Sequence, residues 1–524
     1  MDLKTEFRKI LQHYRQKNFH LTIEKSDKFL KKFGDYAEIY NLKGLCYEAQ
    51  NQKEKAVTNY QKVLSIDPQS LPSLVNLGNV NKDLKNFDIA EKCYLQVIKI
   101  NPNYIKAYSN YANLLSKTNR TDESIKNYKK SLELFYKTNE NPKNALLIHY
   151  NLGLVYETVG DVSAVRSQVE IMLKIDPKFT RADYLLSTSK KYSKGDKHIE
   201  EMEHKLNNYN LTKFSKTLLY FSLGKAYEDI KDYQKSYEKL KLANDSYREI
   251  IELNFNFESE KDFFNNIKEE FKNFDKSFES NYKEKKMIFI MGMPRSGTTL
   301  MEQIISTNDK VSAGGEMESL PNLIGHYFVK DRAKGKLKNI EEALKKNDPT
   351  EISKEFYKYL EKYNLNKNII TDKSVLNFLF IGHIKCLFPN AKIIHCKRDP
   401  RNNCFSIYKL LFEGSMYWSY SQSEVAQYYK LYEDLMVFWK NKYPNFICDA
   451  EYEKIIEHPE KEIKRIIEFC DLEWDDKYLK FYENKNPIRT NSSDQARKPI
   501  YKGSLNKVAK YEQYLSEMFS ILEK

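Results

Sequence analysis

The sequence MIFIMGMPRSGTT at residues 287–299 joins an apolar run to a short glycine-containing turn. The run Met287–Met291 ends at Gly292, and a helix-compatible pattern of apolar residues begins after Thr299. A strand, a tight loop and a helix in this order point backbone N–H groups and a helix N-terminus at one place. This stretch therefore predicts a binding loop for an anionic group such as phosphate or sulfate.

The spacing of Gly292 and Gly297 is that of a phosphate-binding loop. In NTP-hydrolysing proteins a Lys follows the second glycine directly, and Thr298 stands at that position here. The positive charge lies inside the loop instead, at Arg295. These differences count against ordinary ATP chemistry and are compatible with a phosphate or sulfate ligand.

Length and composition predict a helix-rich chain with more than one domain. The 524 residues suffice for two or three domains, and Gly (16) and Pro (14) are scarce. The net charge is +13, but Lys alternates with Glu and Asp and no basic block stands alone. We therefore expect no nucleic-acid partner.

Cysteine and histidine spacing bears on redox state and metals. The seven cysteines form no CxxC pair, and they are Cys46, Cys93, Cys386, Cys396, Cys404, Cys448 and Cys470. Sparse, scattered cysteines in a long chain predict a reduced, cytoplasmic protein. The nine histidines show no paired-ligand spacing, so we expect no metal. No apolar run reaches the about 18–20 residues of a membrane span, and none is predicted.

The first half of the chain repeats with a period of 34 residues. The residues that recur at this spacing are Gly44 and Gly78, Ala56 and Ala90, Tyr60, Tyr94 and Tyr128, and Pro68 and Pro102. The pattern resembles the tetratricopeptide repeat (TPR), in which helix pairs stack into a superhelix. Three regular copies lie in about 37–138, with a fourth near 153–177 and a degenerate one near 224–243.

This array predicts an all-α TPR superhelix over residues 1–250. A segment rich in Phe, Asn and Glu, residues 251–286, is predicted to be a helical linker to the next domain. The concave face of such an array is the expected place for a protein or peptide partner.

Polar residues follow two further strands of the second half. The strand Asn368–Thr371 ends in Asp372 and Lys373, and the strand Ala391–Cys396 ends in a basic run. Strands that alternate with helices predict a parallel α/β sheet whose ligand binds at the strands' C-terminal ends. The predicted fold is therefore multidomain, with the all-α superhelix followed by a P-loop-like α/β domain at residues 287–524.

Four blocks in order carry a more specific resemblance. They are PRSGTTLMEQII at 294–305, GGE at 314–316, DKSVLNFLFIGHIKCLFPNAKIIHCKRDPRNNCFSIYK at 372–409 and SSDQARKPIYKGSLNKV at 492–508. Residues 285–520 resemble the sulfotransferases that use 3′-phosphoadenosine 5′-phosphosulfate, and among these the tyrosylprotein sulfotransferases most closely. Together with the repeats, the layout is similar to a bacterial type of fusion.

The resemblance implies which residues bind this donor. The residues that match the 5′-phosphosulfate loop are Arg295, Ser296, Gly297, Thr298 and Thr299. Arg398 and Ser406 match the residues on the 3′-phosphate, and Tyr452 matches an aromatic residue near the adenosine. The segment that folds over the donor supplies four further predicted ligands, which are Ser492, Gln495, Lys498 and Lys507.

One position departs from the family pattern. A basic residue is expected four positions after Ser406, where this chain has Leu410 with Lys409 beside it. Either Lys409 replaces the missing residue, or the affinity for the 3′-phosphate is weaker.

Sulfuryl transfer needs a base for the acceptor's proton and donors that stabilise charge on the leaving phosphate. The resemblance implies Glu316 as the base, Lys373 as the donor to the bridging oxygen, and Arg295 and Ser492 as flanking stabilisers. No metal is required, because Arg and Lys supply the charge that Mg²⁺ supplies in kinases.

The predicted function is transfer of the sulfuryl group to a hydroxyl acceptor, with the repeats serving protein interaction. The acceptor stays open between a peptide tyrosine, a sugar and a small hydroxyl compound. The alternatives are a TPR scaffold protein with a vestigial nucleotide pocket and a nucleotide kinase. Thr298 at the usual Lys position counts against the kinase.

Overall fold

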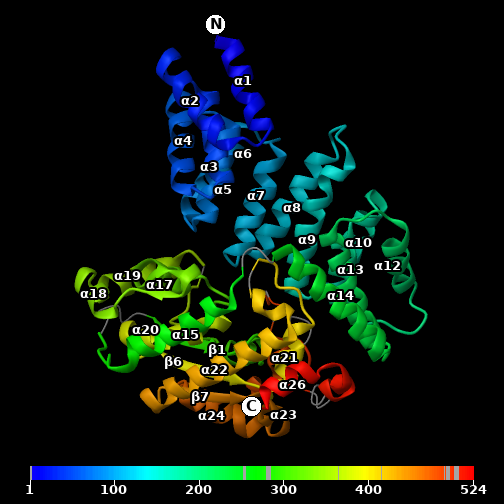
Figure 1. Ribbon diagram of the computed structural model, residues 1–524, viewed down its shortest axis with the longest axis vertical. Coiled ribbons are helices and arrows are strands. Elements are labelled where there is room, and N and C mark those ends of the chain that lie inside the picture. Colours follow the sequence, from blue (N-terminus) through cyan, green and yellow to red (C-terminus); the bar gives the residue numbers. More distant parts are fainter. Residues whose placement is uncertain are drawn as a thin grey trace. The chain divides into compact units, whose positions relative to one another are not determined.

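The structure is a computed structural model that describes residues 3–251, 255–278, 285–363, 365–414, 416–484, 486–488, 490, 496–500 and 507–523. The chain divides into two compact units, Met1–Val155 and Tyr156–Lys524 (Figure 1). This division follows packing within each unit, so the domain limits predicted at residues 250 and 286 remain a prediction.

The first unit is built of helices that pair with their neighbours along the chain (Figure 1). Its helices are α1 (Leu3–Arg15), α2 (Phe19–Phe33), α3 (Ala37–Ala49), α4 (Lys53–Ile66), α5 (Leu71–Asp83), α6 (Phe87–Ile100), α7 (Ile105–Lys117), α8 (Thr121–Phe135) and the first part of α9 (Leu146–Val159). A Cβ added at Gly44 would lie 2.4 Å from the Tyr60 ring, and one at Gly78 would lie 2.6 Å from Tyr94. Both tyrosines are fully buried, so the repeated glycine permits the close approach of paired helices.

The second unit begins with helices of the same kind. They are α10 (Val162–Ile175), α11 (Thr180–Ser189), α12 (Lys197–Asn208), α13 (Lys213–Asp229), α14 (Tyr233–Ile251) and α15 (Phe257–Lys272). The pair α13–α14 has the same glycine contact, because a Cβ at Gly224 would lie 2.7 Å from Leu240. Helix α15 occupies part of the segment that the sequence predicts to be a helical linker.

A five-stranded sheet follows, with the order β2-β5-β1-β6-β7. Its strands are β1 (Lys286–Met291), β2 (Val311–Ala313), β5 (Ile369–Asp372), β6 (Lys392–Lys397) and β7 (Ile447–Glu451). All four strand pairs are parallel, with Phe289 opposite Asp372 and Met291 opposite His395. The carboxyl ends of all five strands therefore meet at one edge.

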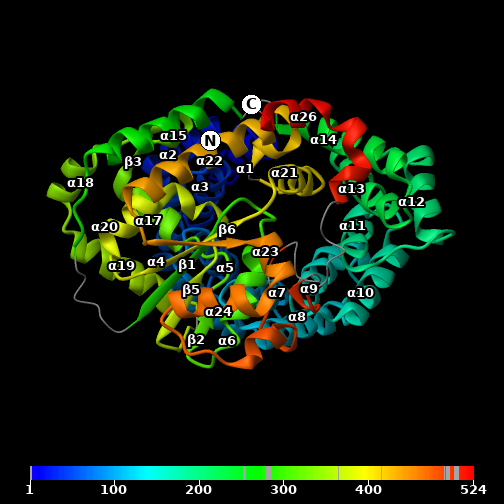
Figure 2. The same ribbon diagram turned by 90° about the horizontal axis from the view of Figure 1, so that it is seen from below.

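Alternate residues of β1 face two different buried clusters, because side chains of a strand alternate between the faces of its sheet. Phe289 belongs to a large cluster that includes Leu218 of α13 and Leu240 of α14. Ile288 and Ile290 belong to a second cluster on the other face. Figure 2 shows the strands between α15 and α22 (Gln422–Lys442) on one side and α24 (Pro459–Phe469) on the other.

Further short elements surround the sheet. They are α16 (Thr298–Ile305), α17 (Ser319–Phe328), β3 (Val329–Asp331), β4 (Lys336–Leu337), α18 (Ile340–Lys346), α19 (Pro349–Glu361), η3 (Val375–Phe380), α20 (Ile381–Leu387), α21 (Pro400–Tyr408), η4 (Tyr417–Tyr420), α23 (Tyr452–Glu457), η5 (Asp476–Glu483), η7 (Lys507–Tyr514) and α26 (Ser516–Leu522). The hairpin β3–β4 lies between α17 and α18 along the chain. Gly335 (φ +61°) lies in its turn, close to the backbone of Ser259 and Phe263 in α15. A Cβ at this position would come within 2.6 Å of the Ser259 carbonyl oxygen, so glycine permits the close approach.

The predicted order of an all-α region followed by an α/β region with a parallel sheet is confirmed. Strands β2 and β7 carry no clear signal in the sequence, because β2 has three residues and β7 contains two acidic side chains. Within the described part of the chain, the helices are too short or too polar to cross a membrane.

Candidate donor pocket and reaction site

The loop after β1 has backbone conformations that side chains rarely adopt. Gly292 has a φ of +147°, and a Cβ there would lie 2.2 Å from the carbonyl oxygen of Cys396 in β6. Arg295 also has a positive φ, +67°, and Gly297, with a φ of +102°, forms the N-terminal cap of α16. The loop thus passes close to the neighbouring strand and leads directly into a helix N-terminus, where N–H groups are unpaired and suit an anion.

Helix α21 and Arg398, two residues before it, hold this loop from the side of β6. Arg398 donates through Nη1 to the carbonyl oxygen of Arg295 at 3.0 Å, and Arg295 Nε lies 3.3 Å from Ser406 Oγ. Asn403, a buried residue of α21, donates to the carbonyl oxygen of Pro294 at 3.0 Å. Three of the residues predicted for the donor phosphates, Arg295, Arg398 and Ser406, are therefore brought together. Asn403 was not predicted, because an Asn inside a helix gives no local signal.

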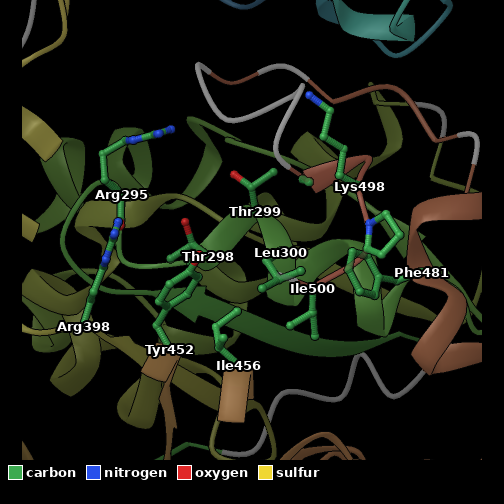
Figure 3. Close-up of a pocket in the computed structure, with 13 residues that line it drawn as sticks. Arg295, Thr298, Thr299, Leu300, Arg398, Tyr452, Ile456, Phe481, Lys498 and Ile500 are labelled. Carbon is green, nitrogen blue, oxygen red and sulfur yellow. The ribbon is translucent and has the colours of Figure 1, made fainter. Parts of the chain in front are cut away.

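Tyr452, at the start of α23, closes one side of the loop. The Arg398 guanidinium lies 4.8 Å from the centre of the Tyr452 ring. Figure 3 shows the two side chains next to each other. A Cβ at Gly297 would lie 2.9 Å from the same ring, so glycine permits the close contact. The ring and the guanidinium together form a wall with both an apolar and a cationic face.

These residues line a pocket of about 620 Å³, including its space open to solvent (Figure 3). Its lining includes seven of the predicted donor ligands, which are Arg295, Gly297, Thr298, Thr299, Arg398, Tyr452 and Lys498. The remaining lining is apolar and was not predicted; it consists of Leu300, Ile456, Phe481, Ala496, Pro499 and Ile500. A cationic end beside an apolar slot suits a ligand that joins anionic groups to a flat ring.

Two buried polar atoms at the loop have no hydrogen-bond partner among the described residues. They are Ser296 Oγ and Arg398 Nε. A buried polar group without a partner is costly, and a bound ligand can supply the missing contact. The predicted ligands Ser492 and Gln495 lie outside the described residues.

The segment that carries Lys498 is fastened to the turn between α9 and α10. Thr158 accepts hydrogen bonds at its carbonyl oxygen from Arg497 Nη2 and from the Ile488 N–H, both at 2.8 Å. Arg497 also lies over Gly160, where a Cβ would come within 2.9 Å of its side chain. A repeat-type turn therefore fixes one wall of the pocket.

Glu316 and Lys373 form an ion pair, with Nζ 2.6 Å from Oε1. The Lys373 side chain is 1% exposed and the Glu316 side chain is 49% exposed. Lys373 directly follows β5, the strand beside β1. This pair and the loop at residues 292–297, which we call the anion loop, therefore leave the sheet at adjacent strand ends. Neighbouring Asp372 is fully buried, and burial raises the pKa of its carboxyl to about 7.

Lys409 does not stand free beside Ser406. Its Nζ lies 2.9 and 2.8 Å from the two carboxylate oxygens of Glu228, at the end of α13. Burial raises the pKa of Glu228, but Lys409, Lys507 and Lys225 lower it by more, so the pKa lies below its ordinary value. The predicted ligand Lys507 is therefore near this pair, and Glu228 adds an unpredicted negative charge beside it.

The cysteines are all buried and free, at each of the seven described positions. Within the described ranges, no three His, Cys, Asp or Glu side chains are grouped so that they could hold a metal ion.

Comparison with known proteins agrees with this architecture. Residues 287–476 match the model of the sulfotransferase family, and residues 37–70, 72–104 and 93–126 match models of the tetratricopeptide repeat. Solved structures similar to this chain include a thermophilic TPR protein of Thermus thermophilus, at 14% identity over 36% of this chain and 98% of that one, with a TM-score of 0.31.

Similar proteins include an uncharacterized protein of Aquifex aeolicus, 31% identical over 63% of this chain and 44% of that protein. A protein-tyrosine sulfotransferase of Drosophila melanogaster is 26% identical over 43% of this chain and 47% of its own length. Human protein-tyrosine sulfotransferase 1 is 22% identical, over 43% of this chain and 64% of that protein. The chain spans less than half the length of the first two of these relatives. The chain thus combines tetratricopeptide repeats with a domain of the sulfotransferase family.

Proposed function

We propose that this protein transfers the sulfuryl group of 3′-phosphoadenosine 5′-phosphosulfate to a hydroxyl acceptor. The observation that carries the proposal is the position of the Glu316–Lys373 ion pair at the strand end next to the anion loop. A base and a cation beside a helix N-terminus are what transfer between a hydroxyl and an anionic donor requires.

The pocket residues fit such a donor. Arg295, Arg398 and Ser406 lie together and can bind phosphate groups, since guanidinium groups and hydroxyls are good phosphate partners. The unpartnered Ser296 hydroxyl and the Arg398 Nε are buried polar atoms that a ligand can satisfy. Tyr452 and the apolar lining suit the adenine ring. We assign Thr298, Thr299, Lys498 and Lys507 to the same donor, and also Ser492 and Gln495, which lie outside the described residues.

The chemistry follows from the charges at the ion pair. The half-exposed Glu316 carboxylate accepts the proton of the acceptor hydroxyl as its oxygen bonds to sulfur. The bond between sulfur and the bridging oxygen of the donor breaks, and Lys373, Arg295 and Ser492 stabilise the negative charge left on the phosphate. Because Lys373 is buried, its charge acts in a medium of low dielectric and is weakly screened.

The acceptor belongs to one of three classes, a peptide tyrosine, a sugar or a small hydroxyl compound. The likeness to protein-tyrosine sulfotransferases favours the peptide, and the repeats offer a surface that can hold a protein or peptide partner. The buried free cysteines are compatible with a cytoplasmic location, which remains a prediction.

Calorimetry and a transfer assay test the proposal. The protein is expected to bind adenosine 3′,5′-bisphosphate, and Glu316→Gln should keep this affinity within about twofold while lowering transfer by ~10²–10⁴-fold. Glu318→Gln, two residues further on in an exposed position, is the matched control and should retain activity. Absence of bisphosphate binding would overturn the proposal. Binding with full activity in Glu316→Gln would overturn the role of this carboxylate.

A further inference from the structure

Glu302 is a buried carboxylic acid in α16 that takes no part in the proposed reaction. It stands four residues after Thr298, one turn into the helix that begins at the anion loop. The residue is only 4% exposed. Burying a carboxyl group costs folding free energy unless the group is hydrogen-bonded, so we expect Glu302 to have hydrogen-bond partners.

A single oxygen of Glu302 accepts two hydrogen bonds. Glu302 Oε1 accepts from the backbone N–H of Gly315 at 3.0 Å and from the hydroxyl of Thr371 at 2.8 Å. Gly315 directly precedes Glu316, and Thr371 is two residues before Lys373 in β5. Glu302 therefore joins the helix of the anion loop to both segments that carry the ion pair.

Other hydrogen bonds also hold the segment at Gly315 in place. Gly314 donates to the carbonyl oxygen of Thr371 at 3.1 Å, and Lys373 donates through its backbone N–H to the carbonyl oxygen of Gly315 at 2.9 Å. Gly315 itself has a φ of +68°, the left-handed conformation in which the chain turns away from β2. The Glu302 contact fixes the N–H of this turning residue, and with it the direction in which Glu316 leaves the strand.

The charges of the ion pair also reach Glu302. Burial raises the pKa of Glu302, the positive charge of Lys373 lowers it, and the negative charge of Glu316 raises it. All three groups therefore lie within electrostatic reach of one another, which agrees with the hydrogen-bond geometry.

We propose that Glu302 is a positioning residue that sets the placement of Glu316 and Lys373 relative to the anion loop. The proposal rests on the proposed function, because it concerns the reaction that this pair performs. Its physical basis is that sulfuryl transfer depends on alignment, and a misplacement of about 1 Å can cost up to ~10²-fold in rate. Glu302 acts through the Gly315 N–H and the Thr371 hydroxyl and does not touch substrate.

Two substitutions separate this role from simple packing. Glu302→Ala removes the acceptor oxygen, whereas Glu302→Gln keeps an oxygen that can accept both hydrogen bonds. Gln303→Ala is the matched control, because it removes a side chain of similar length and burial (1% exposed) from the same helix. Thr371→Val deletes one of the two hydrogen bonds with little change in shape, and serves where Glu302→Ala folds poorly.

The readouts are turnover, the dissociation constant of adenosine 3′,5′-bisphosphate, and hydrogen exchange of the amides in residues 311–318. Glu302→Ala is expected to lower kcat by roughly 10–100-fold, to leave bisphosphate binding within about twofold, and to speed exchange at 311–318. Glu302→Gln should recover most of kcat and normal exchange, and Thr371→Val should lower kcat by about 3–10-fold. Gln303→Ala should change neither.

Three results would overturn the proposal: unchanged kcat and exchange in Glu302→Ala, an equal loss in Glu302→Gln, or an equal loss in Gln303→Ala. If Glu302→Ala does not fold, an unaffected Thr371→Val decides against it. Failure of the proposed function is recognised separately, because the wild-type protein would then transfer no sulfuryl group to any acceptor. The exchange measurement still decides the placement by Glu302 in that case, since it requires no turnover.

Discussion

Lys409 of the α/β region and Glu228 of helix α13 form an ion pair in which Nζ lies 2.9 and 2.8 Å from the two carboxylate oxygens. Both side chains are about four-fifths buried, at 19% and 20% exposure. Lys409 stands about one helical turn after Ser406, and the Ser406 hydroxyl lies beside the Arg295 side chain. A carboxylate from a repeat-type helix thus pairs with Lys409, which is one of the two alternatives for the basic residue missing at Leu410.

We therefore expect Glu228→Gln to tighten binding of adenosine 3′,5′-bisphosphate by roughly 2–10-fold. The reason is that a negative charge is removed beside a site for a phosphate dianion while Lys409 remains. Calorimetry at low and moderate salt measures the change, which should shrink as salt rises. Glu203→Gln is the matched control, since Glu203 pairs with Lys239 at 2.8 Å with similar burial and does not line the donor pocket. Weaker binding in Glu228→Gln would show that the carboxylate serves to place Lys409.

Arg398→Lys should weaken binding of the same ligand by about tenfold. Lysine keeps the charge but loses the flat guanidinium that lies 4.8 Å from the Tyr452 ring and donates to the Arg295 carbonyl. Tyr452→Leu should cost about 2–5-fold and Tyr452→Phe less than twofold, because Phe retains the ring face. Titration calorimetry on the three variants compares these losses. Equal affinities for Arg398→Lys and the wild type would contradict the stacking argument.

Arg497→Met should raise the dissociation constant of adenosine 3′,5′-bisphosphate by about fivefold. The substitution removes the hydrogen bonds from Arg497 to the carbonyl oxygens of Thr158 (2.8 Å) and Asn486 (3.1 Å), which fasten the wall that includes Lys498. Arg465→Met removes a comparable contact, to the carbonyl of Asp449 at 2.6 Å, away from the pocket. A loss of affinity shared by both variants would point to general destabilisation and not to the wall.

Asp372 predicts a pH dependence of stability. Burial raises the pKa of its carboxyl from 3.8 to about 7, so the folded protein holds a proton that the unfolded chain has released. The stabilising contribution of this group is fully present below about pH 4 and is lost as pH rises through about 7. In Asp372→Asn the side chain is neutral at every pH, so the free energy of unfolding does not fall through ionisation at this position. Its free energy of unfolding should therefore improve relative to the wild type by roughly 2–3 kcal/mol between about pH 5 and about pH 8.

Urea unfolding at the two pH values measures this difference. Asn keeps an oxygen that can accept the hydrogen bond that Ser374 N–H donates to Asp372 Oδ1 at 2.9 Å, so the local turn should survive. A difference between variant and wild type that does not change with pH would show that Asp372 is already ionised in the folded protein at about pH 5.

Local patterns allowed much of the fold to be predicted from the sequence. The 34-residue period reflects a contact within one helix pair, that of Gly44 with Tyr60, and so it is visible in a short stretch of sequence. The anion loop is likewise recognisable because its residues, 292–297, are contiguous. Strand β2 could not be predicted, because three residues carry too little alternation and the strand is defined by its pairing with β5.

Contacts between distant segments explain what the sequence could not reveal about the site. Glu302 and Thr371 are 69 residues apart, and Lys409 and Glu228 are 181 residues apart. Neither pair produces a pattern in the local sequence. Glu302 therefore looks like any other Glu in a helix, because its contact with Gly315 exists only in the folded structure. The apolar lining of the pocket, such as Phe481 and Ile500, was missed for the same reason.

The buried cluster that joins Leu218 and Leu240 to Phe289 makes the last repeat-type helices part of the interior of the sulfotransferase-bearing unit. Solvent-exposed residues can be substituted one at a time. Residues that pack against each other in one core constrain each other's size and shape. A change of side-chain size in α13 or α14 is therefore expected to require a compensating change around β1. Engineering that grafts new repeats onto this protein has to join them upstream of Thr158, because the carbonyl oxygen of Thr158 also fastens one wall of the pocket.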